Sequence, residues 1–180
     1  GRGANVTLVS GPVNEAPPAH VNLVPVTTAA EMLTACTNAI AGQPTDIAIC
    51  AAAVADWGVT SAAPKKLKKP HDSSAKMLLE LSQNPDILAN LSTSKDRPKL
   101  VIGFAAETEN LFENARAKRH RKGCDWMIAN QVGDDDDPVF GSVTNKVVMI
   151  TELNVETWPK MRKTELAEKL ADRIEAEFSK

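Results

Sequence analysis

The sequence has no long apolar stretch and no excess of charge of either sign. Its apolar runs fall far short of the ~18 residues that a membrane-spanning helix needs, and no signal-peptide pattern opens the chain. Lysine and arginine together number 21, against 23 aspartate and glutamate residues. We therefore expect a cytoplasmic protein whose overall charge favours neither nucleic acid nor membrane as a partner.

Cysteine is scarce, and two familiar catalytic signatures are missing. Cys36, Cys50 and Cys124 are an odd set without a C-x-x-C spacing, so we expect small core residues in a reducing compartment. No G-x-x-x-x-G-K-[ST] loop is present, which excludes a Walker-type phosphate cradle. The three histidines lie in polar or turn-like surroundings, and no serine–histidine–aspartate candidate accompanies them.

Short apolar runs alternate with helix-like segments along the chain. Strands are expected at residues 5–10, 21–26, 46–53, 99–105, 126–129 and 146–151, the last of these being the final strand. Helices are expected from the capping box Thr28–Glu31 to about residue 42, at residues 108–122, and at the C-terminus, where Leu166, Leu170, Ile174 and Phe178 recur every fourth residue.

Strands separated by helices predict a parallel sheet with helices on both faces. We therefore expect one α/β domain over residues 1–180, a Rossmann-like three-layer fold with a mainly parallel sheet. The exception is the lysine-rich segment at about 59–81, which lacks helical periodicity until residues 76–81. A segment of this length in a compact α/β domain is typical of a flap over an active site.

Three groups of residues have the chemistry of a nucleotide site. Residues 51–57 follow a predicted central strand; their small side chains would let a ligand approach the backbone, and Asp56 suits a ribose hydroxyl or a metal. Four lysines within residues 64–70 suit a polyphosphate. In the helix at 108–122, Lys118 and Lys122 share one face.

Each group also has an ordinary structural explanation, which the residues alone leave open. The first fits a tightly packed strand followed by a turn aspartate. The second fits a solvated surface loop. The third fits cations placed near a helix C-terminus, where the helix dipole favours them.

Taken in chain order, the motifs resemble those of phosphopantothenoylcysteine synthetases. The matches are Val6–Pro12 with the second-strand motif, Ala51–Asp56 with AAVAD, Lys66–Lys69 with K-[IL]-K-K, Asn84–Ile87 with NPDI, Gly103–Thr108 with GFAAET, Ala115–Lys122 with A-R-x-K-R-x-x-K, and Ala129–Asn130 with AN. Seven motifs in family order over nearly the whole chain make this resemblance specific.

The resemblance implies a two-step ligase of coenzyme A biosynthesis. The carboxylate of 4′-phosphopantothenate attacks the α-phosphate of CTP, which releases pyrophosphate and leaves an acyl-cytidylate. The amine of L-cysteine then attacks the acyl carbon and releases CMP. Magnesium is expected to accompany the triphosphate, while its protein ligands stay unassigned.

The resemblance also implies a role for individual residues. Lys66 is the expected catalytic residue, stabilising charge on the α-phosphate, and Lys118 and Lys122 are expected to hold the triphosphate. The full nucleotide-binding set implied by the family is Ala52, Asp56, Lys66, Asn84, Pro85, Asp86, Ile87, Phe104, Lys118 and Lys122.

Family members also carry an N-terminal strand and a glycine-rich turn whose asparagine serves the second step. No residue here matches that asparagine, and we expect the segment to belong to the natural chain. The family further implies a homodimer, with residues 59–81 or 145–151 near the partner. It also implies a possible fused or partner flavin-dependent decarboxylase; FMN is expected only if such a domain precedes this one.

Two other functions remain open on the sequence. One is a non-catalytic or fragmentary nucleotide-binding or dimerisation domain, which the unmatched front of the domain suggests. The other is a nicotinamide-dependent oxidoreductase, which only the predicted fold suggests. Gly1-Arg2-Gly3 is not a dinucleotide fingerprint, because no strand precedes it and no third glycine follows.

Overall fold

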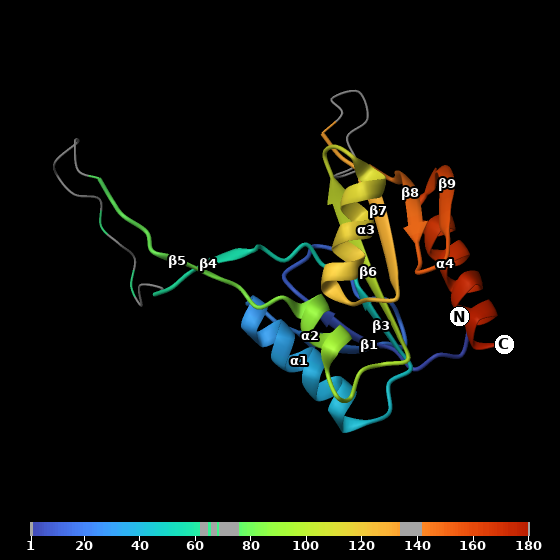
Figure 1. Cartoon of the computed structure of the whole chain (residues 1–180). Helices are drawn as coiled ribbons and strands as arrows, with labels where there is room; N and C mark the ends of the chain where they lie inside the picture. The colour runs from blue at the N-terminus through green and yellow to red at the C-terminus, as the bar shows by residue number, and fades with distance from the viewer. Residues whose placement is uncertain (1, 62–64, 66–67, 69–75, 134–141, 180) are drawn as a thin grey trace. The chain divides into compact units, whose positions relative to one another are not determined.

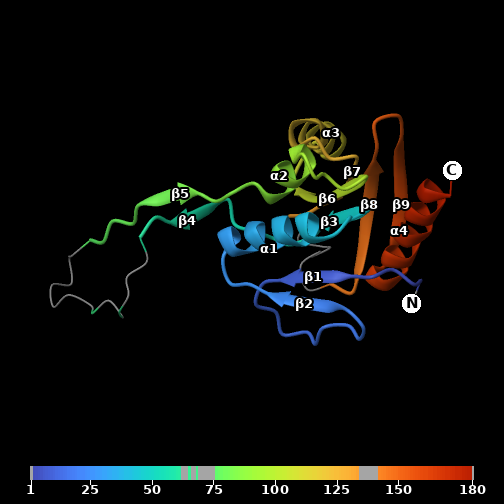
Figure 2. The same ribbon diagram turned by 90° about the horizontal axis from the view of Figure 1, so that it is seen from below.

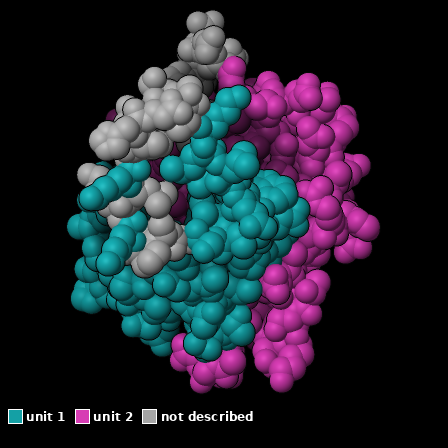
Figure 3. Space-filling view, turned by 90° about the vertical axis from the view of Figure 1, so that its left-hand side faces the viewer, with its two compact units in different colours: residues 1–39, 52–87 teal, residues 40–51, 88–180 magenta. Residues whose placement is uncertain are grey.

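A computed structural model describes residues 2–61, 65, 68, 76–133 and 142–179 (Figure 1). The chain divides into two compact units: unit 1 comprises Gly1–Ala39 and Ala52–Ile87, and unit 2 comprises Ile40–Ala51 and Leu88–Lys180 (Figure 3). The predicted catalytic residue Lys66 and most of the lysine-rich segment lie outside the described residues. That residues 1–180 form a single synthetase domain stays a prediction.

Unit 1 contains a two-stranded parallel sheet and most of the first helix (Figure 2). Strands β1 (Thr7–Ser10) and β2 (Asn22–Pro25) lie within two of the predicted strands. Helix α1 (Ala29–Gly42) begins at the predicted capping box: the Thr27 and Thr28 amides donate to the Glu31 carboxylate at 2.7 and 3.0 Å. These two backbone hydrogen bonds, Thr27 first, lower the pKa of Glu31 from its ordinary value.

The second part of unit 1 is a two-stranded antiparallel ribbon, β4 (Trp57–Val59) with β5 (Leu81–Gln83). It pairs the two ends of the segment at about 59–81, whose role as a flap remains a prediction. The helical periodicity expected at residues 76–81 is wrong, because residues 76–80 form neither helix nor strand and Leu81 begins β5. Six residues are too few to nucleate a helix without packing, so pairing with β4 decides the conformation.

Unit 2 is built on a five-stranded sheet. In spatial order its strands are β3 (Ile47–Cys50), β6 (Leu100–Glu107), β7 (Trp126–Gln131), β8 (Thr144–Ile150) and β9 (Val155–Arg162). The first three run parallel, whereas β8 is antiparallel to β7 and β9 is antiparallel to β8. The α/β fold is confirmed, but the sheet is mixed, and the expectation of a mainly parallel sheet is not confirmed.

The antiparallel half of this sheet follows from a short connection. Only Thr151–Asn154 separate β8 from β9, and so few residues can join antiparallel neighbours but not parallel ones. Strand β9 was missed because Pro159 interrupts its pattern. Proline is tolerated there because β9 is an edge strand and the register with β8 shifts between Asn145 and Val147.

Helices cover both faces of the five-stranded sheet, as predicted (Figures 1 and 2). Alternate side chains point to opposite faces, which gives two core clusters. Helix α4 (Lys163–Phe178) covers the first with Leu166 and Leu170, and α3 (Leu111–Lys122) covers the second with Ala115. Among the described residues, no helix is long and apolar enough to cross a membrane.

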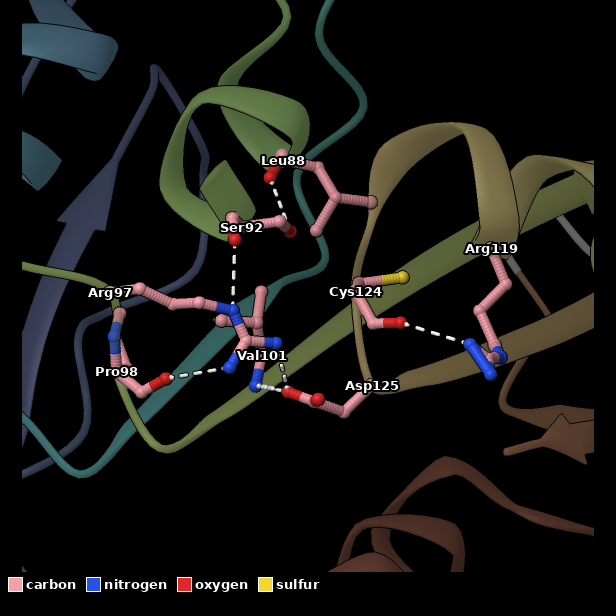
Figure 4. A network of polar contacts seen from close by, with 8 residues as sticks. All are labelled: Leu88, Ser92, Arg97, Pro98, Val101, Arg119, Cys124 and Asp125. Carbon is pink, nitrogen blue, oxygen red and sulfur yellow. Dashed lines mark hydrogen bonds and ion pairs between the residues drawn. The ribbon is translucent and has the colours of Figure 1, made fainter. Parts of the chain in front are cut away.

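A network of hydrogen bonds joins the starts of the parallel strands β6 and β7 to the preceding helix (Figure 4). Asp125 precedes β7, and its Oδ2 accepts hydrogen bonds from Arg97 Nη2 and from the Val101 amide, both at 2.7 Å. Arg97 Nε also donates to the Ser92 carbonyl at 2.8 Å, at the end of α2 (Ile87–Thr93). One aspartate thus joins two parallel strands to the helix that precedes them.

Candidate nucleotide-binding site

In unit 1, two of the predicted motifs come together through Asn84. Its backbone amide donates to the Asp56 carbonyl at 2.8 Å, and its side-chain Nδ2 donates to the Ala55 carbonyl at 2.9 Å. The pairing of β4 with β5 brings these residues together, since Trp57 stands opposite Gln83. The AAVAD and NPDI motifs, far apart in sequence, therefore form one continuous surface.

Gly58 makes this arrangement possible, and sequence reasoning missed it. A Cβ atom at Gly58 would lie 2.7 Å from Asn84 Oδ1, closer than non-bonded atoms approach. A side chain at position 58 would therefore displace the amide that contacts Ala55. The signal in the sequence was a glycine two residues after the AAVAD aspartate, which by itself does not reveal what packs against it.

Of the ten residues predicted to bind the nucleotide, six that the structure describes belong to unit 1. They are Ala52, Asp56, Asn84, Pro85, Asp86 and Ile87. Ala52 and Asp56 are exposed, while Asn84 is half-buried. An exposed backbone of small residues beside a fixed amide can offer carbonyl and amide groups to a base or a ribose.

Unit 2 holds three more of the predicted residues, on both faces of its sheet. Phe104 in β6 is half-buried and packs against the core cluster beneath α4. Lys118 and Lys122 lie on α3, which covers the opposite face, and both are half-buried. Phe104 lies towards the carboxyl end of β6, the edge at which open α/β sheets bind ligands.

Lys118 does not stand alone. Its Nζ lies 2.7 Å from Oε1 of Glu107, the last residue of β6, and the two side chains are only 30% and 12% exposed. The GFAAET motif contains Glu107, yet the residue was absent from the predicted site. Its sequence signal is the even spacing from Val101 and Ala105, which places all three side chains on the α3 face.

The other side of α3 borders a separate groove of about 520 Å³. It is lined by Arg116, Arg119 and His120 from the helix and by Thr151–Val155 at the β8–β9 turn. None of the predicted nucleotide-binding residues lines it. The basic residues of α3 that line this groove are therefore distinct from Lys118 and Lys122, which belong to the predicted site.

Two of the three cysteines lie in surroundings that disfavour the thiolate. Burial raises the pKa of the Cys36 and Cys124 thiols, which keeps both protonated and unreactive at neutral pH. Cys124 is buried, as expected, while Cys36 and Cys50 are half-buried. Within the described ranges, no three His, Cys, Asp or Glu side chains gather in a way that could hold a metal.

Comparison with known proteins identifies close relatives of the chain. It is 40% identical over 173 residues to the coenzyme A biosynthesis bifunctional protein CoaBC of Escherichia coli strain K12, covering 96% of this chain and 42% of that protein. The protein of the same name from Haemophilus influenzae is 37% identical over 180 residues, covering 99% and 43%. The chain thus spans about two fifths of the length of these relatives.

The fold has a similar counterpart among solved structures. The crystal structure of the C-terminal domain of a coenzyme A biosynthesis bifunctional protein CoaBC superposes with a TM-score of 0.76 at 33% identity, covering 98% of this chain and 76% of that one. The family model of the DNA/pantothenate metabolism flavoprotein C-terminal domain matches residues 1–178. The chain belongs to this family, and it is similar to the synthetase part of CoaBC.

Proposed function

We propose that the chain is the phosphopantothenate–cysteine ligase part of a coenzyme A biosynthesis enzyme. The observation that carries the proposal is the surface that Asn84 builds by its hydrogen bonds to Asp56 and Ala55. It joins two motifs that the resemblance assigns to nucleotide binding. Family membership and the name of the E. coli relative support the same pathway.

The proposed chemistry needs positioning and charge rather than a protein nucleophile. A carboxylate oxygen of 4′-phosphopantothenate bonds to the α-phosphorus of CTP while the bond to pyrophosphate breaks. The cysteine amine then bonds to the acyl carbon, loses a proton, and CMP leaves. Lys66 would stabilise charge on the α-phosphate, Lys118 and Lys122 would bind the outer phosphates, and Phe104 would border the nucleotide.

Magnesium would enter this site with the nucleotide. Mg²⁺ prefers phosphate oxygens, waters and one or two carboxylates to an all-protein cage. The described residues fit that mode, since Asp56 is an exposed carboxylate within the proposed nucleotide surface. We assign it no coordination geometry.

The proposed partners follow from the same relatives. Their bifunctional name supports a fused or associated flavin-dependent decarboxylase, and FMN would belong to that domain alone. A cytoplasmic location fits this pathway.

We also propose a homodimer that uses the ribbon of unit 1 and the residues just before β5. Large, apolar and exposed side chains lie there: Trp57, Val59 and Leu81 on the ribbon, and Leu78 and Leu79 before it.

Calorimetric titration with CTP and magnesium tests the nucleotide specificity, with ATP and NADPH as comparisons. We expect CTP to bind and NADPH not to bind. Tight NADPH binding without CTP binding would instead favour an oxidoreductase. If no nucleotide binds even to the full-length natural protein, the non-catalytic alternative gains support.

Replacing Lys66 tests the proposed catalytic role. We expect Lys66→Ala to bind CTP within a few-fold of wild type but to slow pyrophosphate release at least about 100-fold, since one electrostatic group is removed from the transition state. Pyrophosphate release coupled to a colorimetric assay measures this. Lys95→Ala, which removes a lysine outside the proposed site, should behave as wild type. Normal release by Lys66→Ala would contradict the assignment.

A further inference from the structure

Glu107 is held in place by the neighbouring strand β7 in the sheet of unit 2. It ends β6, stands opposite Gln131 of β7, and its carbonyl accepts a hydrogen bond from the Val132 amide at 2.9 Å. Its side chain shares a face with Val101 and Ala105, which lie in the core beneath α3. The backbone therefore fixes where the carboxylate points.

Lys118 lies on α3, whose position is fixed by packing against the sheet and by the turns at both of its ends. Ala115, one turn earlier, is completely buried against the sheet, and a residue this small lets α3 approach closely. The helix starts after Asn110, whose left-handed backbone (φ 47°, ψ 46°) turns the chain back from β6. It ends at Gly123, also left-handed, whose amide donates to the Arg119 and His120 carbonyls.

The two side chains form a close ion pair, with Lys118 Nζ 2.7 Å from the buried Oε1 of Glu107. An ammonium carries three donors, so this pairing leaves it able to donate to a second acceptor. Lys118 is thus held by its charge while it can still donate.

We infer that Glu107 is a positioning residue that holds Lys118 ready to bind the triphosphate, an inference that rests on the proposed function. A lysine side chain loses much rotational freedom when it binds a phosphate, and a fixed counter-charge restricts that freedom before the ligand arrives. The Glu107 side chain is only 12% exposed, so its carboxylate lies beneath the helix and largely out of solvent.

Other roles for Glu107 predict a different change in CTP affinity when the carboxylate is removed. If the carboxylate mainly masked Lys118, its removal would tighten CTP binding, because a negative charge near the phosphates would disappear. If it only stabilised the fold, its removal would lower Tm and leave CTP affinity unchanged. Positioning alone predicts weaker CTP binding that depends on Lys118.

The test is a double-mutant cycle in the full-length protein, with calorimetric affinities for CTP and for CMP. We expect Glu107→Ala to weaken CTP binding about tenfold, with Glu107→Gln intermediate because it keeps an oxygen acceptor. CMP affinity should change less than about twofold, since CMP lacks the phosphates assigned to Lys118. In a Lys118→Ala background, Glu107→Ala should have little further effect. Glu109→Ala removes the same charge from an exposed site two residues away and should match wild type.

The outcomes separate this inference from the function on which it rests. Failure of wild type to bind CTP would overturn both. CTP binding that Glu107→Ala leaves unchanged or tightens would overturn the positioning role alone. The positioning role would also be overturned if Glu107→Ala weakened CTP binding equally in the wild-type and Lys118→Ala backgrounds, because Glu107 would then act independently of Lys118.

Discussion

Single atoms decide the geometry of the candidate site. At Gly58 the missing Cβ leaves the space that Asn84 Oδ1 occupies. That oxygen is the end of a side chain, so a methyl group would rotate Asn84 rather than distort the backbone. The rotation would break the hydrogen bond from Asn84 Nδ2 to the Ala55 carbonyl.

We therefore expect Gly58→Ala to affect binding more than folding. The lost hydrogen bond should cost about 1 kcal/mol of stability, while CTP affinity should fall about tenfold, equivalent to 1.4 kcal/mol. Thermal unfolding and calorimetry measure the two effects. Gly42→Ala is the matched control, because its Cβ would meet nothing within 4 Å. A fall in Tm with unchanged affinity would contradict the role of Gly58.

Residue types predicted part of this site and could not predict the rest. The motifs containing Asp56, Asn84 and Lys118 were found because each has a recognisable sequence. Gly58 and Glu107 were missed because their roles depend on what lies across a strand pair or beneath a helix. Spacing along one segment does not reveal such neighbours before the topology is known.

At the scale of elements, strands and helices with a strong local signal were predicted well. The capping box at Thr28–Glu31 begins α1 as expected, and the apolar runs became β1, β2, β3, β6, β7 and β8. The failures were elements whose signal is tertiary. Strand β9 contains Pro159, the seven-residue α2 is short, and β4 and β5 exist through pairing with each other.

The strand edge around Asp125 gives a prediction at this scale. Its carboxylate accepts two hydrogen bonds at 2.7 Å, one from Arg97 and one from the Val101 amide, and the side chains of Arg97 and Asp125 are only 29% and 34% exposed. We expect Asp125→Asn to lower the free energy of unfolding by about 1–2 kcal/mol, measured by urea denaturation.

The ion pair of Asp46 with Lys99 is the matched control. It also joins two segments of unit 2, at 2.8 Å, but its side chains are 60% and 74% exposed. Asp46→Asn should therefore cost at most about 1 kcal/mol, because solvent screens exposed pairs. Equal losses for Asp125→Asn and Asp46→Asn would show that the network adds no more than a surface ion pair.

At the scale of the whole molecule, the apolar ribbon predicts the oligomeric state. Replacing two exposed residues just before β5, Leu78→Ser with Leu79→Ser, should shift the proposed dimer towards monomer, raising the dimer dissociation constant about tenfold or more. Light scattering over a concentration series measures the shift. Leu153→Ser is the control, since Leu153 is 96% exposed on the β8–β9 turn instead. A monomeric wild type would contradict the dimer, and a dimer that survives both serines would place its interface elsewhere.

Neither compact unit is one continuous stretch of chain. The backbone crosses between them after Ala39, Ala51 and Ile87. Residues 40–51, which contain the edge strand β3 of the larger sheet, therefore lie in sequence between the two segments of unit 1. Expressing residues 88–180 alone would leave β6 without its parallel neighbour β3. A truncation series should therefore give poorly folded products, and gene fusions in this family are best joined outside both units.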